Sequence, residues 1–238
     1  VIGVEALCRW RNATRGLVSP AEFVPLAESS GFIRELGPWV LETACTCLAG
    51  WHTLPGMAAL TLSVNVSARQ FHHPDFVRQV QDAVRRTGAN PARLKLELTE
   101  SIFAEDLDEI VAKMDALRAL GIRFSLDDFG TGYSSLTYLK RLNAEVIKID
   151  QSFVRDMQSD PDDLAIVKGV IGLADAFRRE VIAEGVETIE HGSLLIPLGC
   201  DNAQGYGIAR PMPAHQVPEW VACWRPDVRW QQRDKAPL

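Results

Sequence analysis

The chain has 238 residues, of which 47% are hydrophobic and 24% charged, and its formal net charge is −6. This composition is typical of a globular domain with one substantial hydrophobic core. The acidic balance argues against binding to long nucleic acid, which needs a basic field, but it leaves a small anionic ligand open. The sequence contains no apolar run near the roughly 18 residues that span a bilayer, and no signal peptide.

The five cysteines are odd in number and lack a Cys-x-x-Cys spacing. We therefore expect reduced thiols and a cytoplasmic location, with no membrane contact from this segment. Any membrane anchor of the full-length protein would lie in regions outside this chain.

Hydrophobic periodicity and capping residues predict strands that alternate with helices along the chain. A strand is expected over residues 1–10, and a helix from Pro20, because Ser19 can cap it and Glu22 stands at capping-box spacing. The other predicted strands cover residues 60–67, 94–99, 123–129, 146–150, 181–186 and 203–208. The other predicted helices cover residues 38–51, 74–87, 106–120, 134–142, 162–177, 189–195 and 215–224, and residues 225–238 are expected to form a frayed tail.

Strict alternation of strand and helix predicts a parallel sheet wrapped by helices, an α/β fold. Seven strands are one short of a TIM-like (β/α)8 barrel, so the first strand of that fold is expected to be missing from this chain. An open doubly wound sheet is the alternative, although no Gly-x-Gly-x-x-Gly follows a strand. We predict one domain over residues 1–224 and a C-terminal tail over residues 225–238.

Two adjacent carboxylates, Asp127 and Asp128, end the predicted strand at residues 123–129, and a loop with two glycines follows them. Like charges this close either raise their pKa values or require a cation. A solvated Asp-Asp turn would be the simpler interpretation if the pair stood alone. Other predicted strands, however, carry polar residues at comparable positions.

In a parallel barrel, side chains at the carboxyl ends of the strands converge on one mouth. Any one of these residues alone could be a solvated rim charge, but six acids and one lysine together call for cations or raised pKa values. Oxygen donors without a convincing His or Cys set favour two hard ions, Mg²⁺ or Mn²⁺, of the kind used in phosphoryl transfer. The converging residues are Glu5, Asn65, Glu97, Asp127, Asp128, Asp150 and Glu184, with Lys148 placed to hold the attacking water or a phosphate. The five histidines lack ligand spacing, and we interpret them as surface residues.

Seven ordered blocks resemble the EAL domain family over residues 1 to about 224. The blocks are Glu5-Ala6-Leu7 with Arg9-Trp10, Ser63-Val64-Asn65-Val66-Ser67, Glu97-Leu98-Thr99-Glu100, Asp127-Asp128-Phe129-Gly130-Thr131-Gly132-Tyr133-Ser134-Ser135-Leu136, Lys148-Ile149-Asp150, Ala183-Glu184-Gly185-Val186-Glu187 and Gln204-Gly205-Tyr206. The chain departs from the usual pattern of the family in two places. The family's first strand is absent from this chain, and the residues around Pro197 and Gly207 differ from the usual ones.

The resemblance implies a phosphodiesterase that hydrolyses cyclic di-GMP to linear 5′-pGpG with two Mg²⁺ or Mn²⁺ ions. It implies that Lys148 touches the nucleophilic water, that Glu184 and Asp128 take part in catalysis, and that Glu100 anchors the loop after Asp128. The implied metal ligands are Glu5, Asn65, Glu97, Asp127, Asp128 and Glu184. The implied substrate contacts are Arg9, Leu7, Asp150, Gln204, Tyr206 and Pro211.

The family also contains members that bind cyclic di-GMP without cutting it, so a catalytically silent receptor is the alternative function. Every acid of the metal set is present here, which favours the enzyme. The resemblance further implies a homodimer through residues 134–142 and 162–177, and a sensor or GGDEF domain N-terminal to this chain in the full-length protein.

Overall fold

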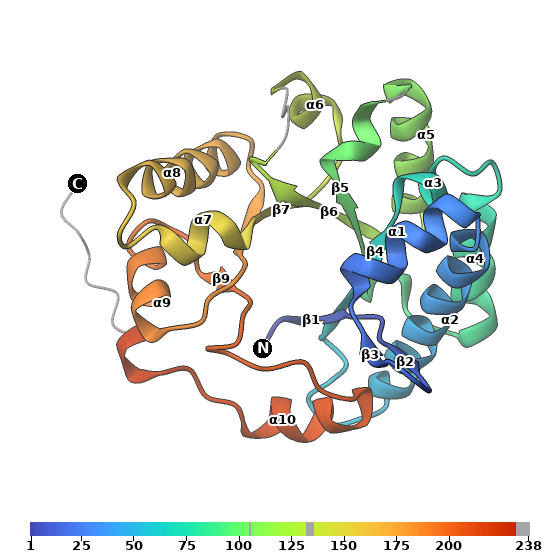
Figure 1. Cartoon of the computed structure of the whole chain (residues 1–238), viewed down its shortest axis with the longest axis horizontal. Coiled ribbons are helices and arrows are strands. Elements are labelled where there is room, and N and C mark those ends of the chain that lie inside the picture. Colours follow the sequence, from blue (N-terminus) through green and yellow to red (C-terminus); the bar gives the residue numbers. More distant parts are fainter. Residues whose placement is uncertain (105, 132–135, 232–238) are drawn as a thin grey trace. The chain divides into compact units, whose positions relative to one another are not determined.

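A computed structural model describes residues 1–104, 106–131 and 136–231 (Figure 1). The chain divides into two compact units, one formed by Val1–Leu98 and Ile102–Arg123, the other by Thr99–Ser101 and the chain from Phe124 onward. Each unit contains parallel strands connected by helices, as the alternation in the sequence predicts. None of the helices formed by the described residues is both long enough and apolar enough to cross a lipid bilayer.

In the first unit, three strands lie parallel in the order β1, β4, β5. Long helices pack beside them, and α2 contacts both α4 and β4. The elements are β1 (Gly3–Ala6), β2 (Trp10–Asn12), β3 (Gly16–Val18), α1 (Pro20–Ser30), α2 (Ile33–His52), β4 (Thr61–Val66), α3 (Ala68–Phe71), α4 (Phe76–Thr87), η1 (Pro91–Arg93), β5 (Leu94–Thr99) and α5 (Leu107–Arg118), with η2 (Glu100–Ala104) at the join.

In the second unit, four strands lie parallel in the order β6, β7, β8, β9. Figure 1 shows α7 and α8 side by side in this unit, and the two helices are in contact. The elements are β6 (Arg123–Phe129), α6 (Leu136–Arg141), β7 (Val146–Ile149), α7 (Gln151–Asp156), α8 (Pro161–Ala176), β8 (Glu180–Ala183), α9 (Ile189–Leu195), β9 (Asn202–Ala203), η3 (Ala214–Gln216), α10 (Val217–Cys223) and η4 (Val228–Trp230).

The region predicted as one strand over residues 1–10 contains a strand followed by the start of a hairpin. β1 ends at Ala6, and β2 and β3 pair antiparallel. The turn between them is organised by the Asn12 side chain, whose Oδ1 accepts hydrogen bonds from Thr14 N at 2.9 Å and Arg15 N at 3.1 Å. Strands of three residues give too short an alternating pattern to be recognised in the sequence.

Helix α2 begins at Ile33, five residues before the predicted start, and Pro38 lies inside it. The buried positions Ile33, Gly37, Leu41, Ala44 and Leu48 recur at helical spacing through the proline. Burial of this stripe outweighs the interior proline, whose missing N–H normally marks a helix start.

Three other predictions need correction. The strand predicted over residues 203–208 ends at Ala203, because the chain turns at Gly205 with φ +156° and packs on the Val186 backbone. Helix α7 was not predicted. The expected frayed tail contains η4, which packs on α9. The first residues of the helix predicted at 134–142, and residues 232–238 of the tail, lie outside the described residues.

Lys113 on α5 holds the end of α3 in the first unit. Its side chain is only 11% exposed, and its Nζ donates to Phe71 O at 3.0 Å and to His73 O at 3.3 Å. The ammonium therefore supplies a donor to the last carbonyl of α3, that of Phe71, whereas His73 O also accepts from Phe76 N at 3.0 Å.

We expect Lys113→Met to lower the free energy of unfolding by about 1–3 kcal/mol, because the Phe71 carbonyl at the end of α3 would lose this donor. Urea unfolding monitored by circular dichroism measures the change. The matched control is Glu109→Gln, which removes only the exposed ion pair of the same lysine and should cost less than about 0.5 kcal/mol. Equal losses in the two variants would contradict this interpretation.

Candidate metal centre

Asp127 and Asp128 lie at a bulge in β6. The register with β7 runs from Leu126 opposite Ile147 to Phe129 opposite Ile149, so three steps along β6 match two steps along β7. Asp128 adopts φ 54°, a left-handed conformation that Asp tolerates better than most residues. A regular strand would send adjacent side chains to opposite faces, whereas the bulge lets both carboxylates approach the same group.

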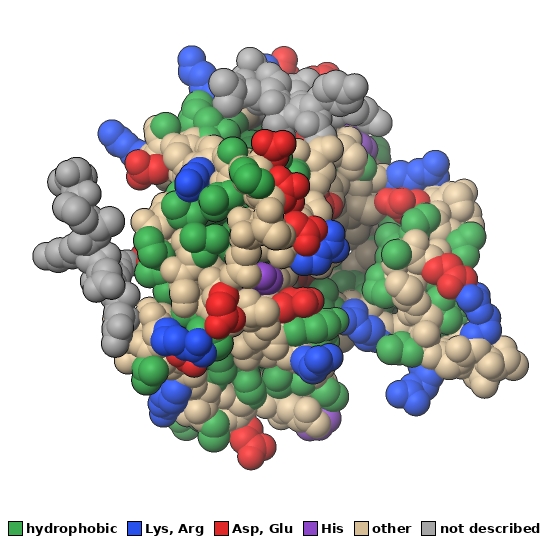
Figure 2. All heavy atoms as spheres, turned by 60° about the vertical axis from the view of Figure 1, so that its left-hand side comes forward, with side chains coloured by type: hydrophobic (Ala, Val, Ile, Leu, Met, Phe, Trp, Pro, Cys, Tyr) green, Lys and Arg blue, Asp and Glu red, His purple; other side chains and the backbone are tan. Residues whose placement is uncertain are grey.

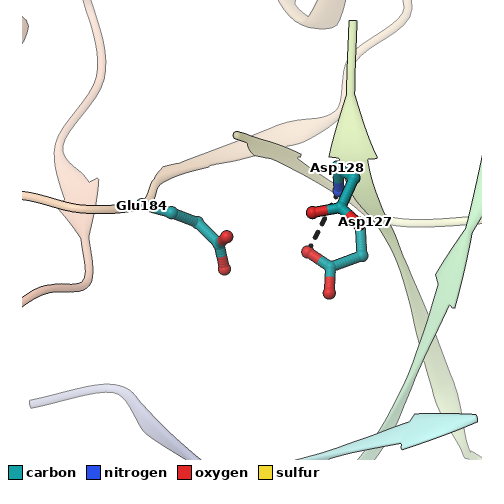
Figure 3. Close-up of side chains that lie close together, drawn as sticks. All are labelled: Asp127, Asp128 and Glu184. Carbon is teal, nitrogen blue, oxygen red and sulfur yellow. Dashed lines mark hydrogen bonds between the residues drawn. The ribbon is translucent and has the colours of Figure 1, made fainter. Parts of the chain in front are cut away.

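Lys148 on β7 links this bulge to Glu184. Its side chain is 1% exposed, and its Nζ lies 3.0 Å from Asp127 Oδ1 and 2.6 Å from Glu184 Oε1. Glu184 follows β8, and its backbone N–H donates to Ile149 O at 3.1 Å. Figure 3 shows the Glu184 carboxylate directed toward Asp127. A buried ammonium is stable only when it is paired, so the two acids and the lysine depend on one another.

Asp150 borders the same group and caps α7. Its Oδ1 accepts hydrogen bonds from Ser152 N at 2.9 Å and from the Ser152 hydroxyl, and its negative charge acts on the Asp128 carboxyl. The pKa of Asp128 is raised to about 6, first by burial and then by the charges of Asp127 and Asp150, against an opposing effect of Lys148. The raised pKa of Asp128 thus reflects the unfavourable free energy of burying one carboxylate beside others.

The donor set fits a hard divalent cation. Asp127, Asp128 and Glu184 each offer a carboxylate oxygen, and these three atoms lie within 4.8 Å of one another. Oxygen-only ligands of this kind suit Mg²⁺ or Mn²⁺. A cation here would also relieve the charge that raises the pKa of Asp128.

A second group of oxygen donors lies in the first unit. Asn65 Nδ2 donates to Glu5 Oε1 at 2.5 Å, and Asn65 stands opposite Glu97 in the parallel register of β4 and β5. Glu97 is 2% exposed. Of the six predicted metal ligands, Glu5, Asn65 and Glu97 thus lie in this unit, and Asp127, Asp128 and Glu184 lie together in the other.

The predicted substrate contacts are mostly accessible. Leu7, Arg9 and Pro211 are exposed, and Gln204 is half-buried. Tyr206 is exposed, and the Arg210 guanidinium lies 4.9 Å from the centre of its ring. Figure 2 shows acidic and basic side chains interspersed on one face of the molecule, in keeping with a small anionic ligand rather than a long polyanion.

Glu100 connects to the loop after Asp128. Its Oε1 accepts a hydrogen bond from Gly130 N at 3.1 Å, and Thr131 N donates to Asp128 O at 3.3 Å. The later loop residues Gly132-Tyr133-Ser134-Ser135 lie outside the described residues, so the predicted anchoring role of Glu100 rests on the Gly130 contact.

The interpretation of all five histidines as surface residues is wrong for His191. His191 is 5% exposed, and its Nδ1 accepts from Glu187 N at 3.3 Å while its own N–H donates to Thr188 Oγ1 at 3.2 Å. Thr188 caps α9, and His191 stands three residues later, where a capping box has Glu or Gln. That spacing was the available signal for a buried, hydrogen-bonded side chain.

Comparison with known proteins supports the family resemblance of the seven sequence blocks. A protein-family model described as EAL domain matches residues 1–211. The bifunctional diguanylate cyclase/cyclic di-GMP phosphodiesterase MucR of Pseudomonas aeruginosa is 44% identical over 222 residues, covering 93% of this chain and 32% of that protein. The cyclic di-GMP phosphodiesterase PA2567 of the same organism is 42% identical over 221 residues, covering 92% of this chain and 37% of that protein. The chain thus spans about a third of the length of these relatives.

Solved structures confirm the fold class. The PaMucR phosphodiesterase in complex with c-di-GMP matches with a TM-score of 0.87 at 44% identity, covering 91% of this chain and 87% of that one. The described residues form seven parallel strands, and together with this likeness they confirm a TIM-like α/β fold in which, among those residues, one strand of a (β/α)8 barrel is missing.

We expect Asp128→Asn to stabilise the metal-free protein at pH 7.5 and to leave its stability unchanged near pH 3.5. The folded-state pKa of Asp128 exceeds its ordinary value of 3.8, so the folded protein binds more protons and loses stability as pH rises from about 4 to about 6. A two-unit shift equals about 3 kcal/mol, which solvent screening at this half-buried site reduces to about 1 kcal/mol.

Thermal unfolding in chelator at the two pH values measures this effect. Asp201→Asn, at an exposed position outside the bulge, is the control and should show no such difference between pH values. A destabilised Asp128→Asn protein at pH 7.5 would show that the carboxylate is not under electrostatic strain.

Proposed function

The chain belongs to the EAL domain family, and on that premise we propose that it hydrolyses cyclic di-GMP to linear 5′-pGpG. The observation that carries the proposal is the buried Lys148 ammonium held between Asp127 and Glu184, beside Asp128 on its bulge. The relatives named as cyclic di-GMP phosphodiesterases match over almost the whole of this chain.

The proposed site would take two Mg²⁺ or Mn²⁺ ions: Glu5, Asn65 and Glu97 would serve as ligands to one, Asp128 and Glu184 as ligands to the other, and Asp127 would contribute to both. When bound, such ions lower the pKa of a water and neutralise charge on the phosphate. The protein supplies rigid oxygen donors: Glu97 and Asp127 are buried on strands, and Asn65 is hydrogen-bonded to Glu5.

Lys148 has two tasks in this proposal. It keeps the carboxylates of Asp127 and Glu184 together, and its ammonium would donate a hydrogen bond to the attacking water or to a phosphate oxygen when substrate is bound. Glu184 is assigned as a ligand that can also accept a proton from the water. Addition of water across one phosphodiester breaks a P–O3′ bond, which leaves one free 3′-hydroxyl and one 5′-phosphate, as in 5′-pGpG.

The substrate would be held by Leu7, Arg9, Asp150, Gln204, Tyr206 and Pro211. An exposed arginine suits a phosphate, and an exposed aromatic ring suits a purine. Glu100 would maintain the loop that follows Asp128 through Gly130. By the same resemblance we assign residues 225–238 to a tail outside the catalytic domain of residues 1–224.

The test is incubation of the purified chain with cyclic di-GMP and Mg²⁺ or Mn²⁺, followed by chromatography of the nucleotides. We expect 5′-pGpG, and a loss of rate of at least about a hundredfold in Glu97→Gln and Asp127→Asn, because removing even partners of metal ligands typically costs about 10–100-fold. Glu219→Gln, at an exposed position on α10, is the control.

Retained activity in both variants would contradict the ligand assignment. Tight binding of cyclic di-GMP without cleavage, by a folded protein in either metal, would instead identify a receptor module.

We further propose that the chain dimerises through α6 and α8, and that a sensor or GGDEF domain accompanies it in the full-length protein. Ile166 is an exposed apolar residue on α8. Sedimentation velocity should show a dimer for the wild-type chain and a monomer for Ile166→Glu, because a buried charge opposes association. Leu17→Glu, at an exposed apolar position in the β2–β3 hairpin, should remain dimeric. A wild-type monomer at every concentration would exclude this interface.

A further inference from the structure

A short C-terminal segment packs against the helix that follows Glu184. This segment, Asp227–Trp230, lies beyond residue 211, where the match to the family ends. Asp227 Oδ1 accepts from Arg229 N at 2.9 Å and thereby caps η4. We call Asp227–Trp230 the C-terminal clamp.

Trp230 makes two contacts with α9. Its Nε1 donates to Ile189 O at 2.9 Å, and its ring lies on Gly192, where an added Cβ would come within 2.4 Å of Nε1. Gly192 is therefore the residue that allows the indole to reach the helix backbone. Arg229 adds an exposed ion pair, with Nη1 3.3 Å from Glu190 Oε1, which contributes little by comparison.

The first turn of α9 in turn holds the segment that carries Glu184. His191 Nδ1 accepts from Glu187 N, and the cap Thr188 accepts from His191 N. On its other side the same segment is hydrogen-bonded to the chain after β9, through Val186 N to Gln204 O at 3.0 Å and Gly207 N to Val186 O at 2.9 Å. The turn 184–187 is thus fixed between β9 and α9.

We propose that Trp230 and His191 are positioning residues for Glu184, with the C-terminal clamp securing α9 and His191 passing that restraint to the turn 184–187. The catalytic part of this inference rests on the proposed function, because it matters to rate only if the Glu184 carboxylate must be placed accurately. Carboxylates that bind metal or move a proton act efficiently only within about 0.5 Å of their productive position. A segment outside the matched family region would then tune the site.

The first test measures hydrogen exchange in the metal-free protein and is independent of any activity. In Trp230→Ala we expect the amides of residues 185–188 to exchange about tenfold faster, because the local opening of the turn becomes easier. The amides of β7 should be unchanged, since a general loss of stability would accelerate both. Trp224→Ala removes another half-buried tryptophan, one that contacts Trp220, and should leave residues 185–188 unaffected.

Two further variants distinguish the loss of the indole hydrogen bond from the loss of the ring itself. Trp230→Phe keeps a ring over Gly192 but loses the N–H donor. The exchange rate of residues 185–188 in this variant should therefore fall between those of wild type and Trp230→Ala. Gly192→Ala should accelerate the exchange of residues 185–188 as Trp230→Ala does, because the added Cβ displaces the indole. The double variant Gly192→Ala/Trp230→Ala should exchange no faster than either single variant, because both changes break the same contact.

The second test uses the enzyme. Trp230→Ala and His191→Ala should lower kcat about tenfold and raise the Mn²⁺ concentration for half-maximal activity about tenfold, with KM for cyclic di-GMP nearly unchanged. His191→Gln, which retains an acceptor, should recover most of the rate. Loss of active protein without a change in metal dependence would mean a purely structural role.

Unchanged exchange at residues 185–188 in Trp230→Ala would overturn the proposal, whatever the activity. Faster exchange in a chain whose wild type never cleaves cyclic di-GMP would retain the link between the clamp and the turn, and would reject the proposed function instead.

Discussion

The Lys148 ammonium between the carboxylates of Asp127 and Glu184 is the interaction on which the site depends. A lysine with 1% of its side chain exposed cannot stay charged without close partners, and two carboxylates this close cannot both stay charged without a cation. Each group therefore makes the others possible. The pKa of the neighbouring Asp128 is raised first by burial and then by the negative charges of Asp127 and Asp150.

The proposed divalent cation would relieve this repulsion, because its charge would favour the ionised form of Asp128. A raised folded-state pKa implies that the ionised Asp128 carboxylate lowers the stability of the metal-free chain at neutral pH, a relation common at active sites. Asp150, whose charge also raises the pKa of Asp128, is itself stabilised by hydrogen bonds from Ser152 at the first turn of α7.

The turn that carries Glu184 receives its restraint from several separate parts of the chain. β7 holds it through the Ile149 carbonyl, the segment after β9 through Gln204 and Gly207, and α9 through His191. Close backbone approach at Gly205, whose added Cβ would lie 2.4 Å from Val186 N, makes the second of these contacts possible. A loop with so many backbone partners places its carboxylate without relying on a bound ligand.

The sequence by itself determined the alternation of strands and helices, and hence the fold class, because burial of each apolar face follows directly from its period. It also determined which acids and amide could serve as ligands, since residue types at strand ends are visible without coordinates. Only the tertiary structure decided that Asp127, Asp128 and Glu184 each bring a carboxylate oxygen within 4.8 Å of the others, because the bulge in β6 is set by its register with β7. It likewise decided that His191 is buried and that Trp230 lies on Gly192, since both depend on contacts between segments that are distant in the chain or too short to show a period.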